Sequence, residues 1–375
     1  MSEARHKLCL MPYVCPECFP DAWLKRVVRE HATADKCDLC RVSGPRIAAP
    51  IESVVEHIKA WMSGSFTESI PVPWREGEPA TWHPGTTWST DELLWDLLGL
   101  DVRDRPKLLS ALVDALGRER RWALADPAVF PEHERLRLNW AKFCWRIKHE
   151  SRFFLLSDAR ERIALEELGR RCLTFGLIRT LPAGTRLIRA RQQWHRAWTT
   201  PSDLGPPPGE LAIQSNRMSP PGISLFYAAD DEETALDEMR QPGTYALAEF
   251  EILKPTPVLD LTRVPLVPSF FDPASRESRS SIVFLAQFAE EISRPIERDD
   301  RIHLEYIPTQ VMTEYFRREF RDVRLLGIRY ASAQRAGEVC TALFAGATAV
   351  VGGHPGEEEP DVRWLRLIRR WERRR

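Results

Sequence analysis

The sequence predicts an α+β protein in which a small cysteine-rich module and a helical domain precede a mixed β-sheet domain. Two Cys-x-x-Cys pairs occur near the N-terminus, helical periodicity dominates residues 51–175, and residues 223–229 have the apolar content of a buried strand. Neither a Walker loop nor a Gly-x-Gly-x-x-Gly loop occurs, which disfavours a doubly wound nucleotide-binding sheet. We expect boundaries at 1–48, 49–178, 179–353 and 354–375.

The cysteine-rich module contains the pairs Cys15, Cys18 and Cys37, Cys40, separated by 18 residues. Each pair can form a tight turn whose thiolates converge on one tetrahedral ion at about 2.3 Å. Four thiolates close the coordination shell, so we expect a structural zinc ion with no open position for a substrate. Redox-active or disulfide-bonded pairs are the alternative. The remaining cysteines are scattered in apolar contexts and are expected in the core: Cys9, Cys144, Cys172 and Cys340.

Between the two pairs, residues 19–36 predict one helix with Asp21 as its N-cap. This helix carries Arg26 and His31, which match the Arg-x-x-x-x-His pattern of HEPN ribonucleases. An Arg and a His at this spacing could stabilise a phosphate and move a proton. A solvated helix face is the alternative, because a charged helix produces such a pattern easily.

The middle of the chain predicts four helices: residues 52–64, a helix that begins at Ser89 or Thr90, residues 106–117 with Pro106 in the first turn, and residues 158–175. Tryptophans are frequent in this region. We expect them to pack in cores or between elements, since Trp is usually at least partly buried. These residues are Trp61, Trp74, Trp82, Trp88 and Trp95.

Composition disfavours nucleic-acid-binding, membrane-spanning and secreted proteins. The net charge of −1 gives no bulk electrostatic attraction to nucleic acid. No apolar run reaches the roughly 18 residues that a membrane span needs, and the N-terminus lacks a signal-peptide core, so we expect a bacterial cytoplasmic protein without a membrane partner. Only the tail is basic. We expect it to be an amphipathic helix that docks through Trp364, Leu365, Ile368 and Trp371, while a contact with nucleic acid or an acidic partner stays open.

A loop, a strand and an acidic helix at residues 216–240 place Arg217, Tyr227 and Glu238 on three successive elements. The Asn, Pro and Gly residues of the loop can bring its backbone close to a ligand. An arginine, an aromatic hydroxyl and a carboxylate so placed suit an anionic substrate that contains a ring and develops positive charge. A dinucleotide such as NAD has these properties.

This region resembles the RES domain, a family named for Arg, Glu and Ser residues. The resemblance covers about residues 179–353 and rests on a strand at 187–191, the loop and turn at 216–222, Tyr227-Ala228-Ala229 and Ala235-x-x-Glu238. The loop departs from the family, because Asn216 precedes Arg217 and the family's Trp and paired Gly are missing. Residues 306–317, 327–333 and 339–344 resemble the closing strands. The leading cysteine-rich and helical region resembles a HEPN/RES N-terminal domain.

The resemblance implies an ADP-ribosyltransferase-like sheet and an enzyme that degrades NAD by phosphorolysis or hydrolysis, in the manner of a bacterial toxin or stress effector. It implies catalytic roles for Arg189, Tyr227 and Glu238. It implies NAD-binding roles for Arg191, Asn216, Arg217, Thr309 and Ser332. An antitoxin or inhibitory protein is the implied partner, and a homo-oligomer stays open. ADP-ribosyl transfer to a macromolecule and a zinc-dependent RNA- or protein-binding module with a degenerate RES domain are the competing hypotheses.

Several assignments have alternatives. Arg189 and Arg191 alternate with apolar residues on a strand, so one of them could face solvent. Tyr227 could be a core residue, and Glu233 competes with Glu238. Thr309 and Ser332 both satisfy the family's hydroxyl position. We interpret His195 as a loop or cap residue rather than a base.

Overall fold

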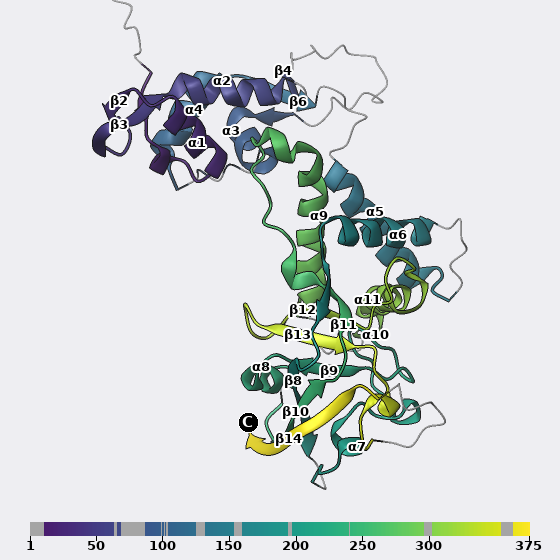
Figure 1. Cartoon of the computed structure of the whole chain (residues 1–375). Coiled ribbons are helices and arrows are strands. Elements are labelled where there is room, and N and C mark those ends of the chain that lie inside the picture. The colour runs from purple at the N-terminus through teal and green to yellow at the C-terminus, as the bar shows by residue number, and fades with distance from the viewer. Residues whose placement is uncertain are drawn as a thin grey trace, which may run out of the picture. The chain divides into compact units, whose positions relative to one another are not determined.

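The computed structural model describes residues 11–63, 66–68, 87–98, 100, 102, 104–124, 132–153, 160–193, 197–239, 241–295, 302–353 and 363–375. The chain folds into two compact units (Figure 1). The first combines Met1–Pro131 with Val267–Ser280, and the second combines Glu132–Leu266 with Ser281–Arg375. Within these described ranges, no helix has both the length and the apolarity required to cross a membrane.

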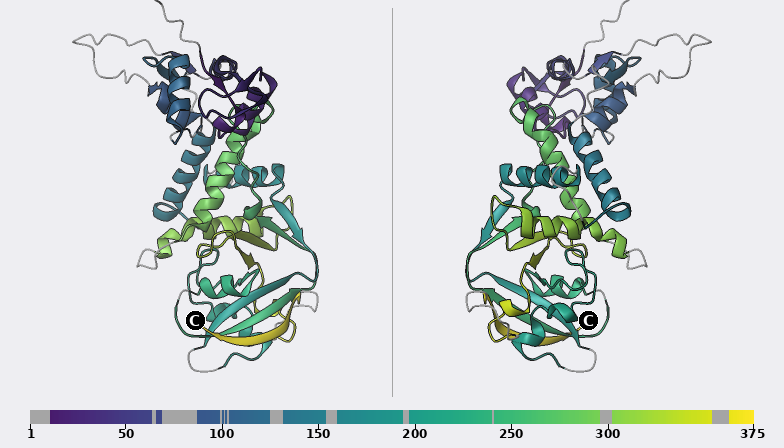
Figure 2. Two further views of the ribbon diagram at one scale, coloured as in Figure 1. Left: turned by 90° about the vertical axis from the view of Figure 1, so that its left-hand side faces the viewer. Right: turned by 90° about the vertical axis from the view of Figure 1, so that its right-hand side faces the viewer.

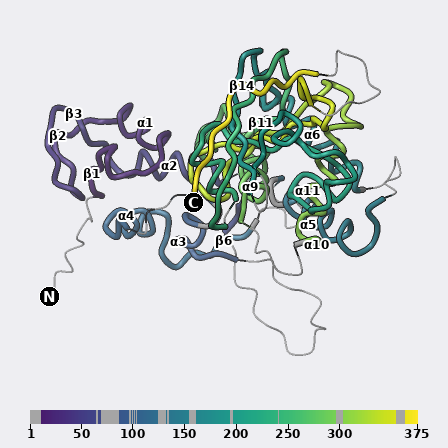
Figure 3. Tube along the Cα trace, turned by 90° about the horizontal axis from the view of Figure 1, so that it is seen from below, coloured from purple at the N-terminus to yellow at the C-terminus, as the bar shows by residue number. Residues whose placement is uncertain are grey.

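The N-terminal part of unit 1 is a three-stranded antiparallel sheet with one helix, whose elements gather together in Figure 3. They are β1 (Tyr13–Val14), η1 (Pro16–Cys18), α1 (Ala22–Glu30), β2 (Ala34–Lys36) and β3 (Ser43–Pro50). The Asp21 carboxylate accepts a hydrogen bond from the Leu24 amide at 2.9 Å, which confirms the predicted N-cap. The helix is shorter than predicted, because α1 ends at Glu30 and the chain continues into β2.

The rest of unit 1 consists of helices and a second small sheet with the strand order β4-β6-β5. Its elements are α2 (Ile51–Met62), β4 (Phe66–Glu68), β5 (Trp88–Ser89), α3 (Thr90–Glu92), the π-helical turn η2 (Leu93–Leu97), α4 (Pro106–Leu116) and β6 (Arg121–Leu124). Ser89 and Glu92 form a capping box at the start of α3, and Pro106 occupies the first turn of α4. Both predicted helix starts are therefore confirmed.

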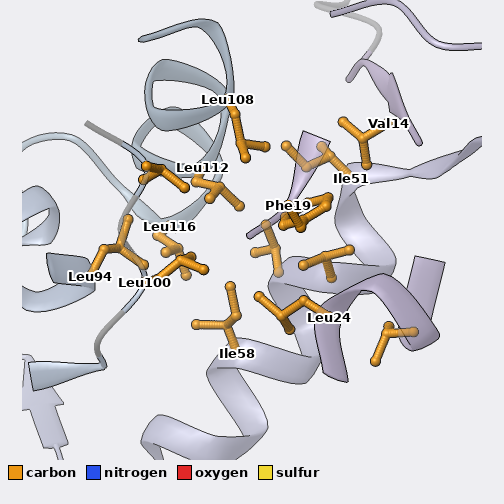
Figure 4. Close-up of a cluster of buried hydrophobic side chains, with 14 of the residues drawn as sticks. Val14, Phe19, Leu24, Ile51, Ile58, Leu94, Leu100, Leu108, Leu112 and Leu116 are labelled. Atoms are coloured by element: carbon orange, nitrogen blue, oxygen red, sulfur yellow. The ribbon is translucent and has the colours of Figure 1, made fainter. Parts of the chain in front are cut away.

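The core of unit 1 is formed by apolar side chains from α1, α2, α4 and the segments between them (Figure 4). Figure 4 shows Phe19, Leu24 and Ile58 close to Leu112 and Leu116. Of the five tryptophans predicted to pack, Trp61, Trp88 and Trp95 lie against this core. The other two, Trp74 and Trp82, lie outside the described residues.

A segment from far along the chain completes this core. Phe271 is fully buried in it, and its carbonyl oxygen lies 3.2 Å from His57 Nε2. The neighbouring Phe270 packs on Trp61, with ring centroids 5.4 Å apart. Val267–Ser280 therefore belongs to unit 1, although the sequence on both sides of it belongs to unit 2.

We expect Phe271→Ala to lower the free energy of unfolding of unit 1 by about 3–5 kcal/mol, because it removes a fully buried aromatic ring and leaves a cavity. Urea denaturation followed by tryptophan fluorescence measures this change. The matched control is Leu266→Ala, since Leu266 is 94% exposed five residues earlier. Equal, small effects of the two substitutions would contradict the packing role of Phe271.

Unit 2 is built on an eight-stranded mixed sheet with the order β14-β10-β8-β9-β13-β12-β11-β7 (Figure 2). Its strands are β7 (Ile178–Leu181), β8 (Arg186–Gln193), β9 (Phe226–Ala229), β10 (Thr244–Ile252), β11 (Thr256–Asp260), β12 (Gly327–Ala331), β13 (Val339–Leu343) and β14 (Leu365–Arg374). The pair β11 and β12 is parallel, and the other neighbouring pairs are antiparallel. The predicted class of a mixed sheet after helical elements is confirmed.

Four helices, α5 (Glu132–His149), α6 (Arg160–Thr174), α9 (Arg276–Ser293) and α11 (Ile307–Glu314), supply apolar residues to the core that covers the β11–β13 part of this sheet. Unit 2 also contains α7 (Pro201–Leu204), α8 (Glu232–Asp237) and α10 (Ile302–Glu305). Shorter turns of unit 2 are η3 (Gly209–Leu211), η4 (Leu261–Arg263), η6 (Tyr315–Glu319) and η7 (Ala347–Ala349), whereas η5 (Pro273–Ser275) and the first residues of α9 belong to the segment of unit 1. The helix predicted at 158–175 is α6.

The predicted C-terminal helix is wrong, because Leu365–Arg374 is the edge strand β14. It pairs antiparallel along β10, with a register shift between Glu249 and Phe250. Leu365, Leu367 and Trp371 are its least exposed residues, whereas Ile368, which the helix prediction placed on the docked face, is exposed. The C-terminal segment forms a strand because β10 would otherwise have an unpaired edge. Strand pairing satisfies the backbone N–H and C=O groups of β10, which a docked helix would leave without partners.

The closing strand predicted at 306–317 is also wrong. This segment forms α11 and η6, with Pro308 in the first turn of α11. Thr309, Met312 and Phe316 are buried at the i, i+3, i+7 spacing of a helix, which the sequence interpretation overlooked. The two other predicted closing strands are confirmed as β12 and β13.

Candidate functional site

A cleft of about 740 Å³ opens in unit 2 where the sheet splits between β8 and β9. These two strands share a single residue pair, Ile188 with Ala229, whereas β8 pairs with β10 along its whole length. Residues 188–192 of β8 line the cleft, because beyond Ile188 no strand of the described residues pairs with β8 on the side that faces β9. The wall also contains the loop before β9, β9 itself and the end of α8, together with Trp198, Tyr306, Tyr330 of β12 and Cys340 of β13.

Arg189 lies across this split. Its Nη1 donates to the carbonyl oxygen of Tyr227 on β9 at 2.9 Å, and its guanidinium lies 5.5 Å from the ring centroid of Phe226. Its Nε is buried without a hydrogen-bond partner, and no carboxylate of the described residues pairs with it. Burial and the nearby charge of Arg191 lower the pKa of Arg189 to about 10. A half-buried guanidinium that no carboxylate of the described residues neutralises can bind an anion.

Arg191 follows two residues later on the same face of β8. Its guanidinium stacks on Trp198, 4.1 Å from the ring centroid, and donates to the carbonyl oxygen of Asp203. The indole nitrogen of Trp198 donates to the Gln192 carbonyl at 2.8 Å, which fixes the ring. Both arginines of the predicted strand therefore line the cleft, and neither is directed only to solvent.

The loop before β9 is held by Arg217 and Thr309. The Arg217 guanidinium donates to the carbonyl oxygens of Ile292 and of Arg294 (2.7 Å) at the end of α9. The Thr309 hydroxyl lies within hydrogen-bond distance of the Arg217 carbonyl. Arg217 borders the cleft, but its side chain is already bonded, and Thr309 does not line the cleft. Asn216 also borders the cleft, and its backbone pairs with Ser219.

Tyr227 fastens this loop to the sheet. Its hydroxyl lies 2.9 Å from Ser219 Oγ and accepts a hydrogen bond from the Met218 amide at 3.3 Å. Burial raises the pKa of Tyr227, so the phenol stays protonated at neutral pH. The ring lines the cleft while its hydroxyl positions the loop.

Glu238 lies at the C-terminal end of α8 and lines the cleft. Ser332 Oγ donates to Glu238 Oε1 at 2.6 Å, and it accepts from the amides of Gln334 and Arg335 at 3.2 Å each. The serine therefore fixes the carboxylate in one orientation. The competing Glu233 is exposed, pairs with Arg373 at 3.4 Å, and does not line the cleft.

Trp198, Ser219, Tyr330 and Cys340 are among the cleft residues that the sequence interpretation missed. Cys340 was assigned to the core, and it is 3% exposed at the edge of the cleft. Burial and the adjacent Glu238 carboxylate raise the pKa of its thiol. Of these residues, only Ser219 could have been predicted from the sequence, because it lies two residues after Arg217 in the predicted ligand-binding loop. His195 lies outside the described residues.

The four predicted metal ligands come together in unit 1. The sulfur atoms of Cys15, Cys18, Cys37 and Cys40 all lie within 4.8 Å of one another. Measured separations are 3.8 Å for Cys15 and Cys18, 3.4 Å for Cys15 and Cys40, and 3.5 Å for Cys18 and Cys37. A tetrahedron with bonds of about 2.3 Å has edges of about 3.8 Å, so the cluster could hold one metal ion.

Arg26 and His31 make their side-chain contacts with residues of α1. Arg26 Nε pairs with Glu30 at 2.8 Å, and its guanidinium lies 5.0 Å from the ring centroid of Trp23. His31 Nδ1 lies 2.9 Å from the carbonyl oxygen of Val27 at the end of α1. These contacts are those of a solvated helix face and a helix cap.

Two family models match the chain. HEPN/RES N-terminal domain 1 matches residues 30–161, and the RES domain matches residues 186–364. No curated protein and no solved structure gives a match. The first match begins after Arg26, and the second contains every residue that lines the cleft. The chain is therefore a RES-domain protein that carries a HEPN/RES N-terminal domain.

Proposed function

We propose that the cleft cleaves the bond between nicotinamide and ribose in NAD. RES domains support an NAD-related, toxin-like function at the level of the family. The observation that carries the proposal for this chain is the pairing of two features in one cleft. Arg189, a half-buried arginine that pairs with no carboxylate of the described residues, borders the same space as Glu238, a carboxylate held by Ser332.

Arg189 is the group that we assign to the pyrophosphate. Its Nη1 is engaged with the Tyr227 carbonyl, which fixes the plane of the guanidinium across the split sheet. A fixed guanidinium presents permanently charged donors to phosphate oxygens. Arg191 adds a second positive charge on the same face of the strand. The split in the mixed sheet supports an ADP-ribosyltransferase-like architecture for this binding cleft.

Glu238 is the carboxylate that we assign to the reaction. When the bond between the anomeric carbon and the ring nitrogen breaks, its electron pair leaves with neutral nicotinamide, and positive charge develops on the ribose. A preorganised carboxylate stabilises this charge or accepts a proton from the attacking nucleophile. Water gives ADP-ribose, and inorganic phosphate gives ADP-ribose 1″-phosphate. Ser332 is a positioning residue that orients Glu238.

We assign positioning roles to Arg217, Thr309 and Tyr227. Their side chains bond to α9, to the loop backbone and to Ser219, so they hold Asn216 and its neighbours at the edge of the cleft. This assignment gives the family's hydroxyl position to Ser332 and not to Thr309. In unit 1, we propose that the four cysteines hold a structural zinc ion, since a shell of four thiolates leaves no position for a substrate.

The direct test is an assay of NAD consumption by the purified full chain, with and without inorganic phosphate. Release of nicotinamide together with ADP-ribose or its 1″-phosphate supports the proposal and identifies the acceptor. Transfer of label from NAD to a macromolecule would instead indicate an ADP-ribosyltransferase. Intact NAD after prolonged incubation with folded, metal-loaded protein would contradict both. If the chain is active, a toxin with an inhibitory protein partner is its expected context.

Arg189→Lys should lower kcat/KM for NAD by roughly tenfold to a hundredfold, since lysine retains the charge and loses the planar fork that binds two phosphate oxygens. Steady-state kinetics measure this change. Arg186→Lys is the matched control on the same strand, because Arg186 is exposed and pairs with Glu249 at 3.4 Å. A similar small change in both variants would show that Arg189 has no special contact with the substrate.

A further inference from the structure

The wall of the cleft includes an exposed apolar segment that the proposed reaction does not use. Leu211 is 65% exposed and Ile213 is 77% exposed, and both line the cleft. Among the large apolar side chains that are exposed in the described residues, only these two border this space. Apolar side chains exposed together in a binding cleft are typical of a surface that a ligand covers.

This segment is held in place on both sides. Ser224 Oγ donates to the Pro207 carbonyl at 2.6 Å, and the Gly222 amide donates to the Ala212 carbonyl at 2.8 Å. Gln310 Nε2 donates to Ser215 Oγ at 3.0 Å. The chain also passes close to itself, since a Cβ on Gly209 would lie 3.1 Å from the carbonyl oxygen of Gly222. The exposed side chains are therefore presented by a braced loop, so less conformational entropy is lost when a ligand binds.

The strand β8 adds charge and an aromatic ring to the same cleft. Arg189 and Arg191 are two residues apart, so they share a face of the strand at a separation of about 7 Å. The second arginine stacks on Trp198, whose ring is fixed by its bond to Gln192. Two cations beside a fixed indole and an apolar loop form a site for a phosphate-linked aromatic group. Glu238 lines the same cleft from another element, the end of α8, and is bonded there by Ser332, which follows β12.

We propose that Leu211, Ile213 and Trp198 form a subsite for the adenine ring of the dinucleotide, so that the cleft selects NAD over nicotinamide mononucleotide. This inference rests on the proposed function, because it takes the bond to be cleaved to lie at Glu238. Both substrates contain that bond, and only the dinucleotide carries a second ring. Contact between the adenine ring and these side chains is expected to make NAD bind roughly tenfold to a hundredfold more tightly than nicotinamide mononucleotide.

The test compares the binding of NAD and of nicotinamide mononucleotide by calorimetry, in the full chain carrying Glu238→Gln to prevent turnover. We expect NAD to bind tenfold to a hundredfold more tightly. Adding Leu211→Ser and Ile213→Ser should reduce that ratio to within about threefold, with mononucleotide binding unchanged. Leu266→Ser is the matched control, since Leu266 is exposed outside the cleft, and it should preserve the ratio.

The outcomes separate the subsite from the reaction. Equal affinities for the two ligands, or a double variant that keeps the ratio, would overturn the subsite, while release of nicotinamide by the unsubstituted chain would still support the reaction. Preferential NAD binding that the double variant abolishes supports the subsite, even if no nicotinamide is released and the proposed reaction fails. Binding of neither ligand to folded protein would overturn both.

Discussion

Glu238→Gln is expected to lower the rate of NAD cleavage by roughly 10²- to 10⁴-fold, the range that a positioned acid–base group contributes. The amide keeps the size of the side chain and can still accept the hydrogen bond from Ser332. It loses the negative charge that stabilises positive charge on the ribose and the capacity to take a proton. KM for NAD should change much less than kcat, because the proposal assigns the pyrophosphate contacts to the arginines on β8 and not to Glu238.

The matched control is Glu233→Gln on the same helix. Glu233 is exposed and pairs with Arg373 on the surface, so its loss is expected to leave turnover within about twofold. Circular dichroism and urea denaturation should show that both variants are folded. If Glu238→Gln retains wild-type turnover, the carboxylate does not act in the reaction. If Glu233→Gln produces the larger loss, the assignment of the two acids is reversed.

Removal of the zinc ion that we propose for the cysteine cluster is expected to unfold the N-terminal sheet and α1. Binding of a structural zinc ion by four thiolates contributes about 10–16 kcal/mol of apparent free energy in small zinc modules. Cys15, Cys18 and Cys37 are also part of the core of unit 1, together with Phe19 and Leu24. Without the ion, four thiolates that lie within 4.8 Å of one another repel, or take up protons, and the cluster opens.

Cys18→Ser, or treatment with a strong chelator, should therefore abolish stoichiometric metal binding and make residues 11–50 exchange backbone hydrogens rapidly. Metal analysis and hydrogen exchange measure these effects. Cys144→Ser is the matched control, because Cys144 is a half-buried thiol in unit 2 and is not a member of the cluster. Unchanged protection of residues 11–50 in metal-free protein would contradict the structural role of the ion.

The candidate site was partly predictable because its chemistry is carried by short motifs. The Cys-x-x-Cys pairs identified the metal cluster, and the strand with Arg189 and the Ala-x-x-Glu helix identified two groups that line the cleft. The choice between Glu233 and Glu238 could not be made from the sequence, since both acids lie on or next to one short helix. Their orientation depends on how α8 packs against β8 and β9, which is a long-range property of the sheet.

The role of Arg217 shows the same limit. In the sequence it resembles a phosphate ligand in a polar loop, and in the structure its guanidinium bonds to carbonyl oxygens about 75 residues later in the chain. The sequence around Arg217 does not indicate that its hydrogen-bond acceptors are backbone carbonyl groups at the end of α9. Arg189 differs because its Nε finds no hydrogen-bond partner among the residues that the structure describes.

Local interactions determined what the sequence alone established: the cysteine cluster, the caps at Asp21 and Ser89, and the strands β8, β12 and β13. Each of these depends on residues that are close together in the chain. The tertiary structure alone decided that the C-terminus is the strand β14, that Phe271 completes the core of unit 1, and that the sheet splits between β8 and β9. The physical reason is that strand pairing and core packing are decided between distant segments, whose burial and backbone hydrogen bonds outweigh local propensity.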